Sequence, residues 1–174
     1  MSWEVEMVKI VRWLIDDRDA TPENSDPELE EAIVVAAQMT QREANFGNVY
    51  LIDVDTLSIS PDPTTTATAG EAKDNAFINL VSLKTACIVC NGEAKNAARC
   101  ALSVSDGLSK IDSREKAKWL VDIASSACKA YEDALFEFKV GQNVAGEAIL
   151  GPFSDGNPKA YYGFPEHGPR SRIF

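Results

Sequence analysis

The 174-residue sequence has a single histidine and no glycine-rich loop of the common phosphate-binding types. That histidine, His167, lies in a stretch near the C-terminus that is rich in glycine and proline. A catalytic histidine needs a neighbouring group that holds and orients it, and no residue near His167 in the sequence supplies one. We therefore interpret His167 as a surface or interface residue.

Long apolar runs are missing as well. None reaches the roughly 18–20 residues that a membrane-spanning helix requires. The N-terminus, MSWEVEMVKIVRWLIDD, has acidic residues where a signal peptide has basic ones, and it has no cleavage site of small residues. We therefore expect no membrane partner and no export signal.

Basic residues are few relative to acidic ones. The chain has 17 Lys and Arg against 27 Asp and Glu, a formal net charge of -10. Such a chain lacks the basic footprint by which nucleic-acid-binding proteins grip phosphates. Residues 1–60 hold 4 basic and 13 acidic side chains, a sum of -9, so the sequence predicts one acidic face near the N-terminus.

The four cysteines are Cys87, Cys90, Cys100 and Cys128, and without an export signal we expect them to be thiols. Cys87 and Cys90 have CxxC spacing, but a zinc site needs two more ligands, and neither a second CxxC nor a histidine pair is present. A thioredoxin-like motif would begin a helix after a strand, whereas this pair lies within a helical pattern. We interpret both residues as core packing.

Two groups of acidic residues resemble functional sites without matching one. Asp53, Asp55 and Asp62 lack the spacing of a calcium loop, and aspartate is a favoured turn residue. The second group surrounds a predicted helix start, where the helix dipole accounts for acids, and comprises Glu23, Asp26, Glu28, Glu30 and Glu31. We accordingly expect no catalytic, cofactor-binding or metal-ligating residues, and a role without a reaction.

Apolar periodicity predicts two helices in the first 45 residues. The first has one apolar face and ends near Asp16, and the face consists of Trp3, Met7, Ile10 and Leu14. The second is capped by Ser25 or Asp26, has Pro27 in its first turn and runs to about Asn45. Its apolar positions are Leu29, Ile33 and Ala36, with Ala32, Val35 and Met39 beside them.

Two longer helices follow. The third has a heptad-like stripe of Ala76, Leu80, Leu83, Cys87, Cys90, Ala94, Ala97 and Ala101. Asn91-Gly92 predicts a kink or an interruption in it, and its alanine-rich second half allows a neighbouring helix to approach closely. The fourth follows the Asp106-Gly107 turn, is capped by Asp112 with Glu115 and ends before Gly141. Its stripe is Leu120, Ala124, Ala127, Tyr131, Ala134 and Phe138.

The sequence between and after these helices completes the predicted fold. Residues 48–60 are rich in β-branched and aromatic side chains and predict one or two short strands, with a turn near Asp53 and Asp55. We predict a mainly α protein: a bundle of about four helices in residues 1–140, a small β-hairpin around 48–63, and an extended C-terminal arm, 141–174. The arm breaks regular structure but keeps apolar and aromatic residues, so it either wraps its own domain or docks on another subunit or partner.

Several segments carry a resemblance to a known family. They are VRWLIDDRDATPENSDPELEEAI (11–33), DNAFINLVSLKTA (74–86), VSDGLSKIDSREKAKWL (104–120) and YEDALFEF (131–138). Over about residues 3–150 the chain resembles the head-to-tail adaptor (connector) proteins of tailed bacteriophages, which begin with a short helix, a loop with Asp and a capped second helix.

The resemblance implies a structural protein of the virion neck that is made in the host cytoplasm. Adaptors of this family form homo-oligomeric rings of about twelve copies beneath the portal protein. The ring extends the channel for double-stranded DNA and offers a platform to the next neck or tail protein. Their C-terminal segments often insert into the portal.

The resemblance also gives roles to particular residues. Channel-facing carboxylates would let DNA slide, and the candidates are Asp16, Asp17, Asp19, Glu23, Glu28, Glu30 and Glu31. The candidates for docking on the portal or another partner are Phe153, Tyr161, Tyr162, Phe164, Arg170, Arg172 and Phe174. The strands of 48–63 become a projecting loop or an edge that pairs between subunits. The alternatives are a stopper-like tail-completion protein, or a monomeric acidic binding module or assembly chaperone.

Overall fold

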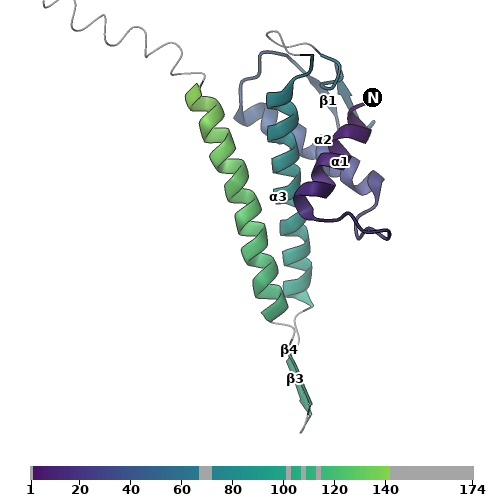
Figure 1. Cartoon of the computed structure of the whole chain (residues 1–174), viewed down its shortest axis with the longest axis vertical. Helices are drawn as coiled ribbons and strands as arrows, with labels where there is room; N and C mark the ends of the chain where they lie inside the picture. Colours follow the sequence, from purple (N-terminus) through teal and green to yellow (C-terminus); the bar gives the residue numbers. More distant parts are fainter. Residues whose placement is uncertain (1, 67–71, 101–102, 107–108, 113–114, 142–174) are drawn as a thin grey trace, which may run out of the picture. The chain divides into compact units, whose positions relative to one another are not determined.

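The computed structural model describes residues 2–66, 72–100, 103–106, 109–112 and 115–141, with the backbone alone for 103–106 and 109–112. The chain divides into two compact units, Met1–Leu135 and Phe136–Phe174. The described part is mainly helical with short antiparallel hairpins, which confirms the predicted fold class (Figure 1). The arm residues predicted to dock, and His167, lie outside the described residues.

Helix α1, Trp3–Ile15, ends one residue before the predicted stop at Asp16. Asp16 adopts a left-handed conformation, with φ of 59°, that terminates the helix. The buried face differs from the predicted stripe and consists of Trp3, Met7, Val8 and Val11. Because α1 packs against both α2 and α3, its buried face is rotated, and Leu14 remains 44% exposed.

Helix α2, Asp26–Glu43, begins as predicted and ends two residues before the predicted Asn45. Ser25 precedes it, and the Glu28 carboxylate accepts hydrogen bonds from the backbone N–H (2.8 Å) and the hydroxyl (2.7 Å) of Ser25. The buried residues are Leu29, Ile33, Val34, Ala36, Ala37 and Thr40. They confirm the three central apolar positions, whereas Met39 is 43% exposed, so its predicted place on the apolar face is wrong.

Strands β1, Leu51–Asp53, and β2, Ser58–Ser60, form the predicted antiparallel hairpin. Asp53 organises the turn: its Oδ1 accepts from the backbone N–H of Asp55 at 2.9 Å, and its Oδ2 accepts from the Thr56 hydroxyl at 2.8 Å. This turn confirms the structural interpretation of Asp53 and Asp55.

Tyr50 anchors the hairpin to the helices. Its ring stacks on Phe77 with centroids 4.0 Å apart, and its hydroxyl donates to Asp74 Oδ2 at 2.7 Å. Asp74 also caps α3, Asn75–Arg99, because its Oδ1 accepts from the backbone N–H of Phe77 at 3.1 Å. One buried carboxylate therefore fixes both the hairpin and the start of α3.

Helix α3 is continuous through Asn91 and Gly92, so the predicted interruption is wrong. Its first half contacts α1 and α2 and is buried over a wider surface than the predicted stripe, while Ala76 of that stripe is exposed. The buried residues are Phe77, Ile78, Leu80, Val81, Ser82, Thr85, Ala86, Cys90 and Ala94. The breadth of this surface follows from its position among three other helices.

A second hairpin, for which the sequence indicated only a turn, lies between α3 and the last helix in the chain. Strands β3, Ser103–Asp106, and β4, Ser109–Asp112, pair antiparallel around the Asp106-Gly107 turn signal. Asp112, predicted as a helix cap, is the last residue of β4. The last helix spans residues 115–141. It therefore includes Gly141, before which it was predicted to end.

Residues 115–135 of the last helix pack antiparallel to α3 (Figure 1, green beside teal). Cys90 and Ala94 of α3 form a buried cluster with Ala124, and partly buried Ile15, Leu120 and Ala127 pack against it. These contacts confirm Cys90 and Ala94 of the stripe predicted for α3, and Ala124 of the stripe predicted for the last helix.

Candidate interaction surface

The connection between α1 and α2 is an acidic loop built around the Asp17 carboxylate. Arg12 Nη1 lies 3.0 Å from Asp17 Oδ2, and the backbone N–H groups of Glu23 and Asn24 donate to the same carboxylate at 2.9 and 3.1 Å. Arg12 Nη2 also contacts Asp26 Oδ1 at 2.6 Å. The loop is thereby held between the end of one helix and the start of the next.

The pKa of Asp17 reflects opposing effects. Burial acts to raise the pKa, but the two backbone N–H groups and the Arg12 guanidinium outweigh it, so the pKa lies below its usual value. The pKa of Glu28 is lowered as well, by its hydrogen bonds from Ser25. Both carboxylates are therefore ionised at neutral pH, and both have structural partners.

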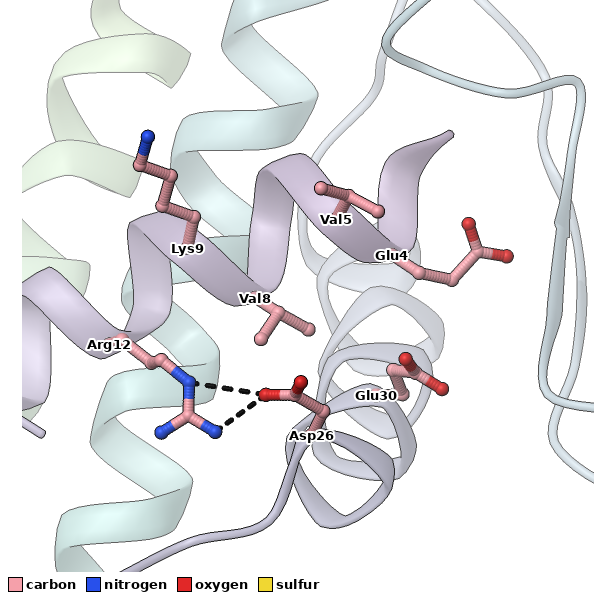
Figure 2. Close-up of a pocket in the computed structure, with 7 residues that line it drawn as sticks. All are labelled: Glu4, Val5, Val8, Lys9, Arg12, Asp26 and Glu30. Atoms are coloured by element: carbon pink, nitrogen blue, oxygen red, sulfur yellow. Dashed lines mark hydrogen bonds and ion pairs between the residues drawn. The ribbon is translucent and has the colours of Figure 1, made fainter. Parts of the chain in front are cut away.

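A small pocket of about 300 Å³ lies between α1 and α2 (Figure 2). Its lining residues are Glu4, Val5, Val8, Lys9, Arg12, Asp26 and Glu30. Figure 2 shows the Arg12 guanidinium directed at Asp26, to which Nε donates at 3.2 Å and Nη2 at 2.6 Å. The pocket is lined by side chains of both charges, and Arg12 is already paired with Asp26. It therefore has no feature that would select one class of ligand.

A larger cavity of about 650 Å³, here called the acidic groove, lies among the α1–α2 loop, α3 and residues 119–130. Its acidic lining residues are Asp16, Asp17, Asp19, Glu23 and Glu93, and no basic residue of the described chain lines it. Asn24 Nδ2 donates to Glu93 Oε1 at 3.2 Å, which links the loop to α3. The groove therefore joins parts of the chain that are about seventy residues apart in the sequence.

The rest of the groove is largely apolar. Its apolar lining comprises Leu14, Ile15, Leu83, Ala86, Trp119, Leu120, Ile123, Ala127 and Ala130. Trp119 is 62% exposed and Ile123 is 36% exposed. Large apolar side chains gathered beside acidic ones are typical of an interaction surface rather than of a solvated helix face.

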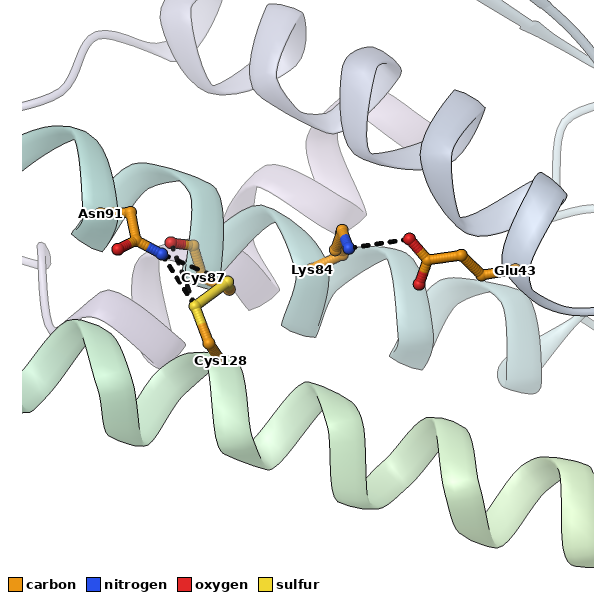
Figure 3. Close-up of a disulfide and its surroundings, with 5 residues drawn as sticks. All are labelled: Glu43, Lys84, Cys87, Asn91 and Cys128. Carbon is orange, nitrogen blue, oxygen red and sulfur yellow. Dashed lines mark hydrogen bonds and ion pairs between the residues drawn. A yellow bond between two sulfur atoms is a disulfide. The ribbon is translucent and has the colours of Figure 1, made fainter.

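A disulfide fastens the two helices that form one wall of the groove (Figure 3). Cys87 of α3 is bonded to Cys128, with an S–S distance of 2.02 Å, and Asn91 Nδ2 donates to Cys128 Sγ at 2.9 Å. The expectation of thiols is therefore wrong for Cys87 and Cys128, because the helix packing brings them together. Cys90 is a buried thiol whose pKa is raised by burial, as core packing implies, and Cys100 is an exposed thiol.

Polar contacts one turn away reinforce the same helix pair. Lys84 Nζ lies 3.0 Å from Glu43 Oε1 and 4.4 Å from the centre of the Tyr131 ring (Figure 3 shows the ion pair). The Tyr131 hydroxyl donates to Glu43 Oε2 at 2.7 Å, and burial together with this bond raises the pKa of Tyr131. Glu43 thus connects α2, α3 and the last helix at one point.

The structure brings together part of the predicted acidic set. Asp16, Asp17, Asp19 and Glu23 line the acidic groove. The other three lie in the first turns of α2: Glu28 in the capping box, Glu30 at the small pocket and Glu31 exposed. Asp16 pairs with Arg18, whose guanidinium stacks over the Trp13 ring.

The apolar half of the groove was not predicted from the sequence. Trp119 is next to Leu120 in the sequence but does not belong to the predicted apolar stripe. An aromatic residue outside the stripe was the one sign in the sequence of an exposed aromatic side chain on this helix. In the described ranges no group of three His, Cys, Asp or Glu residues is arranged to hold a metal ion. Nor does any helix in those ranges have the length and apolarity needed to cross a membrane.

Comparisons of the chain with protein families, with curated proteins and with solved structures find no match.

Proposed function

We propose that this protein is a structural head-to-tail adaptor of a phage virion neck, which forms a homo-oligomeric ring beneath the portal protein. The ring extends the channel for double-stranded DNA and joins the next neck or tail protein. The chain works by assembly and carries out no reaction.

The observation that supports this proposal is the concentration of acidic side chains around the α1–α2 connection. Of the seven acidic residues considered for the channel, Asp16, Asp19, Glu23, Glu28 and Glu31 are exposed. Carboxylates that face a channel repel DNA phosphates, so a duplex passes without binding. The short helix, acidic loop and capped second helix also match the order of elements that the family resemblance implies.

Assembly needs surfaces for the neighbouring subunits and for the portal. In this proposal the C-terminal segment 142–174 supplies docking residues, with Phe153, Tyr161, Tyr162, Phe164, Arg170, Arg172 and Phe174 as anchors. Aromatic and arginine side chains are enriched at interface cores, which supports their selection.

The direct test is co-expression with the portal protein that the proposal names as the partner. We expect a stable complex in size-exclusion chromatography and a ring in electron micrographs, both lost when residues 151–174 are deleted. The control is Gln38→Ala, on an exposed side chain of α2, which should assemble like the wild type. If no complex forms, and the deletion changes nothing, the adaptor proposal fails.

A second candidate, a monomeric binding module or assembly chaperone, is favoured by the acidic groove with its exposed Trp119. Such a protein would bind its client before assembly and be missing from the finished particle. Mass spectrometry of purified virions separates the two: the adaptor is present at a fixed copy number relative to the portal, and the chaperone is depleted.

A further inference from the structure

The charge of the acidic groove is only partly neutralised within the described chain. Asp17 is paired with Arg12, and Asp16 with Arg18. No ion pair in the described ranges involves Asp19 or Glu23, which lie on the same loop. The groove therefore favours an occupant with positive charge.

The same occupant needs apolar side chains. Leu14, Trp119 and Ile123 line the groove and are 44%, 62% and 36% exposed. The same groove is lined by Ile15, Leu120 and Ala127, which pack against the buried cluster of Cys90, Ala94 and Ala124. Exposed apolar side chains on a packed surface are suited to receive aromatic anchors.

One segment of this chain outside the described residues has both properties. Residues 158–174, PKAYYGFPEHGPRSRIF, contain the basic residues Lys159, Arg170 and Arg172 against the single acid Glu166. Their aromatic residues are Tyr161, Tyr162, Phe164 and Phe174. The segment is thus complementary to the groove in charge and in apolar character.

We propose that the acidic groove of one copy binds residues 158–174 of a second copy. The inference rests on the proposed homo-oligomeric function and names the contact that links neighbouring subunits. A groove and a segment are different surfaces, so their pairing is heterologous, and repeated heterologous contacts form a ring when the rotation between subunits closes.

Photo-crosslinking of the full chain identifies the occupant. Tyr161 is replaced by p-benzoylphenylalanine, and ¹⁵N-labelled and unlabelled chains are mixed, irradiated, digested and analysed by mass spectrometry. We expect crosslinks from position 161 to residues 119–130, with mixed-isotope pairs as frequent as same-isotope pairs. Same-isotope pairs alone would show that each chain fills its own groove, and crosslinks only to other regions would show a different contact; either result overturns the proposal.

Charge reversal tests the complementarity. The groove variant Asp19→Lys/Glu23→Lys and the arm variant Arg170→Glu/Arg172→Glu should each weaken self-association about tenfold or more, measured by analytical ultracentrifugation. An equimolar mixture of the two variants should recover self-association, because the basic groove of one variant then meets the acidic arm of the other. The matched control, Asp55→Lys/Glu132→Lys, makes the same change in net charge at exposed positions outside the groove and outside the proposed channel-facing set.

The outcomes separate this inference from the adaptor proposal. Wild-type self-association by the groove variant, or a wild-type chain that stays monomeric at every accessible concentration, overturns the groove inference. If the arm variant loses portal binding while the groove variant retains it, the arm docks on the portal, and the adaptor proposal stands without this contact. Circular dichroism of every variant confirms that the helices are retained.

Discussion

At the scale of single residues, a few carboxylates hold segments that are distant in the sequence. Asp74 binds Tyr50 and caps α3, and Asp17 gathers Arg12 and the loop backbone. Charge-assisted hydrogen bonds of this kind are stronger than neutral ones. Individual acidic residues therefore stabilise the fold as well as giving the chain its charge.

The Asp17 carboxylate should make stability depend on pH. Its pKa is lower in the folded chain than the usual value near 3.8. Its contribution is therefore complete above that value and is lost as the pH falls through the lower folded pKa. Asp17→Asn should lower the free energy of unfolding by about 1–2 kcal/mol at pH 7.

Urea denaturation of the wild type and Asp17→Asn between pH 7 and pH 2 provides the measurement. The difference between the two proteins should begin to shrink below about pH 4, where Asp17 of the unfolded chain takes up a proton. It should vanish once the pH is below the lowered pKa of folded Asp17, because that side chain is then uncharged in both states. Asp19→Asn, on the same loop, is the matched control and should show little difference at any pH. A constant gap for Asp17→Asn down to pH 2 would contradict the assigned role.

At the scale of secondary-structure elements, local signals set the helix ends, and packing sets the buried faces. The capping box of Ser25 and Glu28 begins α2, and the left-handed Asp16 ends α1. Ser2, by contrast, precedes α1 without a side-chain capping bond. The two helices thus have differently secured starts.

This contrast supplies a matched pair of substitutions. Ser25→Ala should lower the free energy of unfolding by about 1 kcal/mol, because Glu28 loses the hydroxyl donor. Ser2→Ala removes no capping bond and should be nearly neutral. Thermal denaturation followed by circular dichroism gives both values; equal losses in the two variants would contradict the capping assignment.

At the scale of the whole molecule, the link between α3 and the last helix decides whether the acidic groove exists. The groove takes residues from both helices and from the α1–α2 loop. Cys87 and Cys128 are separated by 41 residues in the sequence, so their disulfide closes a long loop in the unfolded chain. The bond therefore restricts the unfolded chain while it fastens one wall of the groove.

Reduction should accordingly destabilise the protein. The chain-entropy relation gives a loss of up to about 4 kcal/mol for a loop of this length. Denaturation with and without dithiothreitol measures it, and Cys87→Ser/Cys128→Ser should be insensitive to the reductant. Thiol titration of the unfolded, unreduced chain should find Cys90 and Cys100 alone; four reactive thiols would contradict the disulfide.

The sequence by itself determined the helices and the first hairpin of this protein, because their signals are local. The capping residues, the apolar spacing of Leu29, Ile33 and Ala36, and the β-branched run before Pro61 predicted α2 and the first hairpin correctly. Local hydrogen bonds and side-chain periodicity depend on neighbours within a few residues, so they can be read along the chain. The mainly helical fold class followed from the same signals.

Only the tertiary structure decided the surfaces between the elements. The pairing of Cys87 with Cys128, the rotation of the α1 face away from Leu14 and the groove beside Trp119 all depend on which helices pack together. An apolar stripe shows that one face of a helix will be buried. It does not show which element the helix packs against, or how the helix is rotated about its axis in that contact. Those depend on side-chain fit between segments far apart in the sequence, which periodicity does not encode.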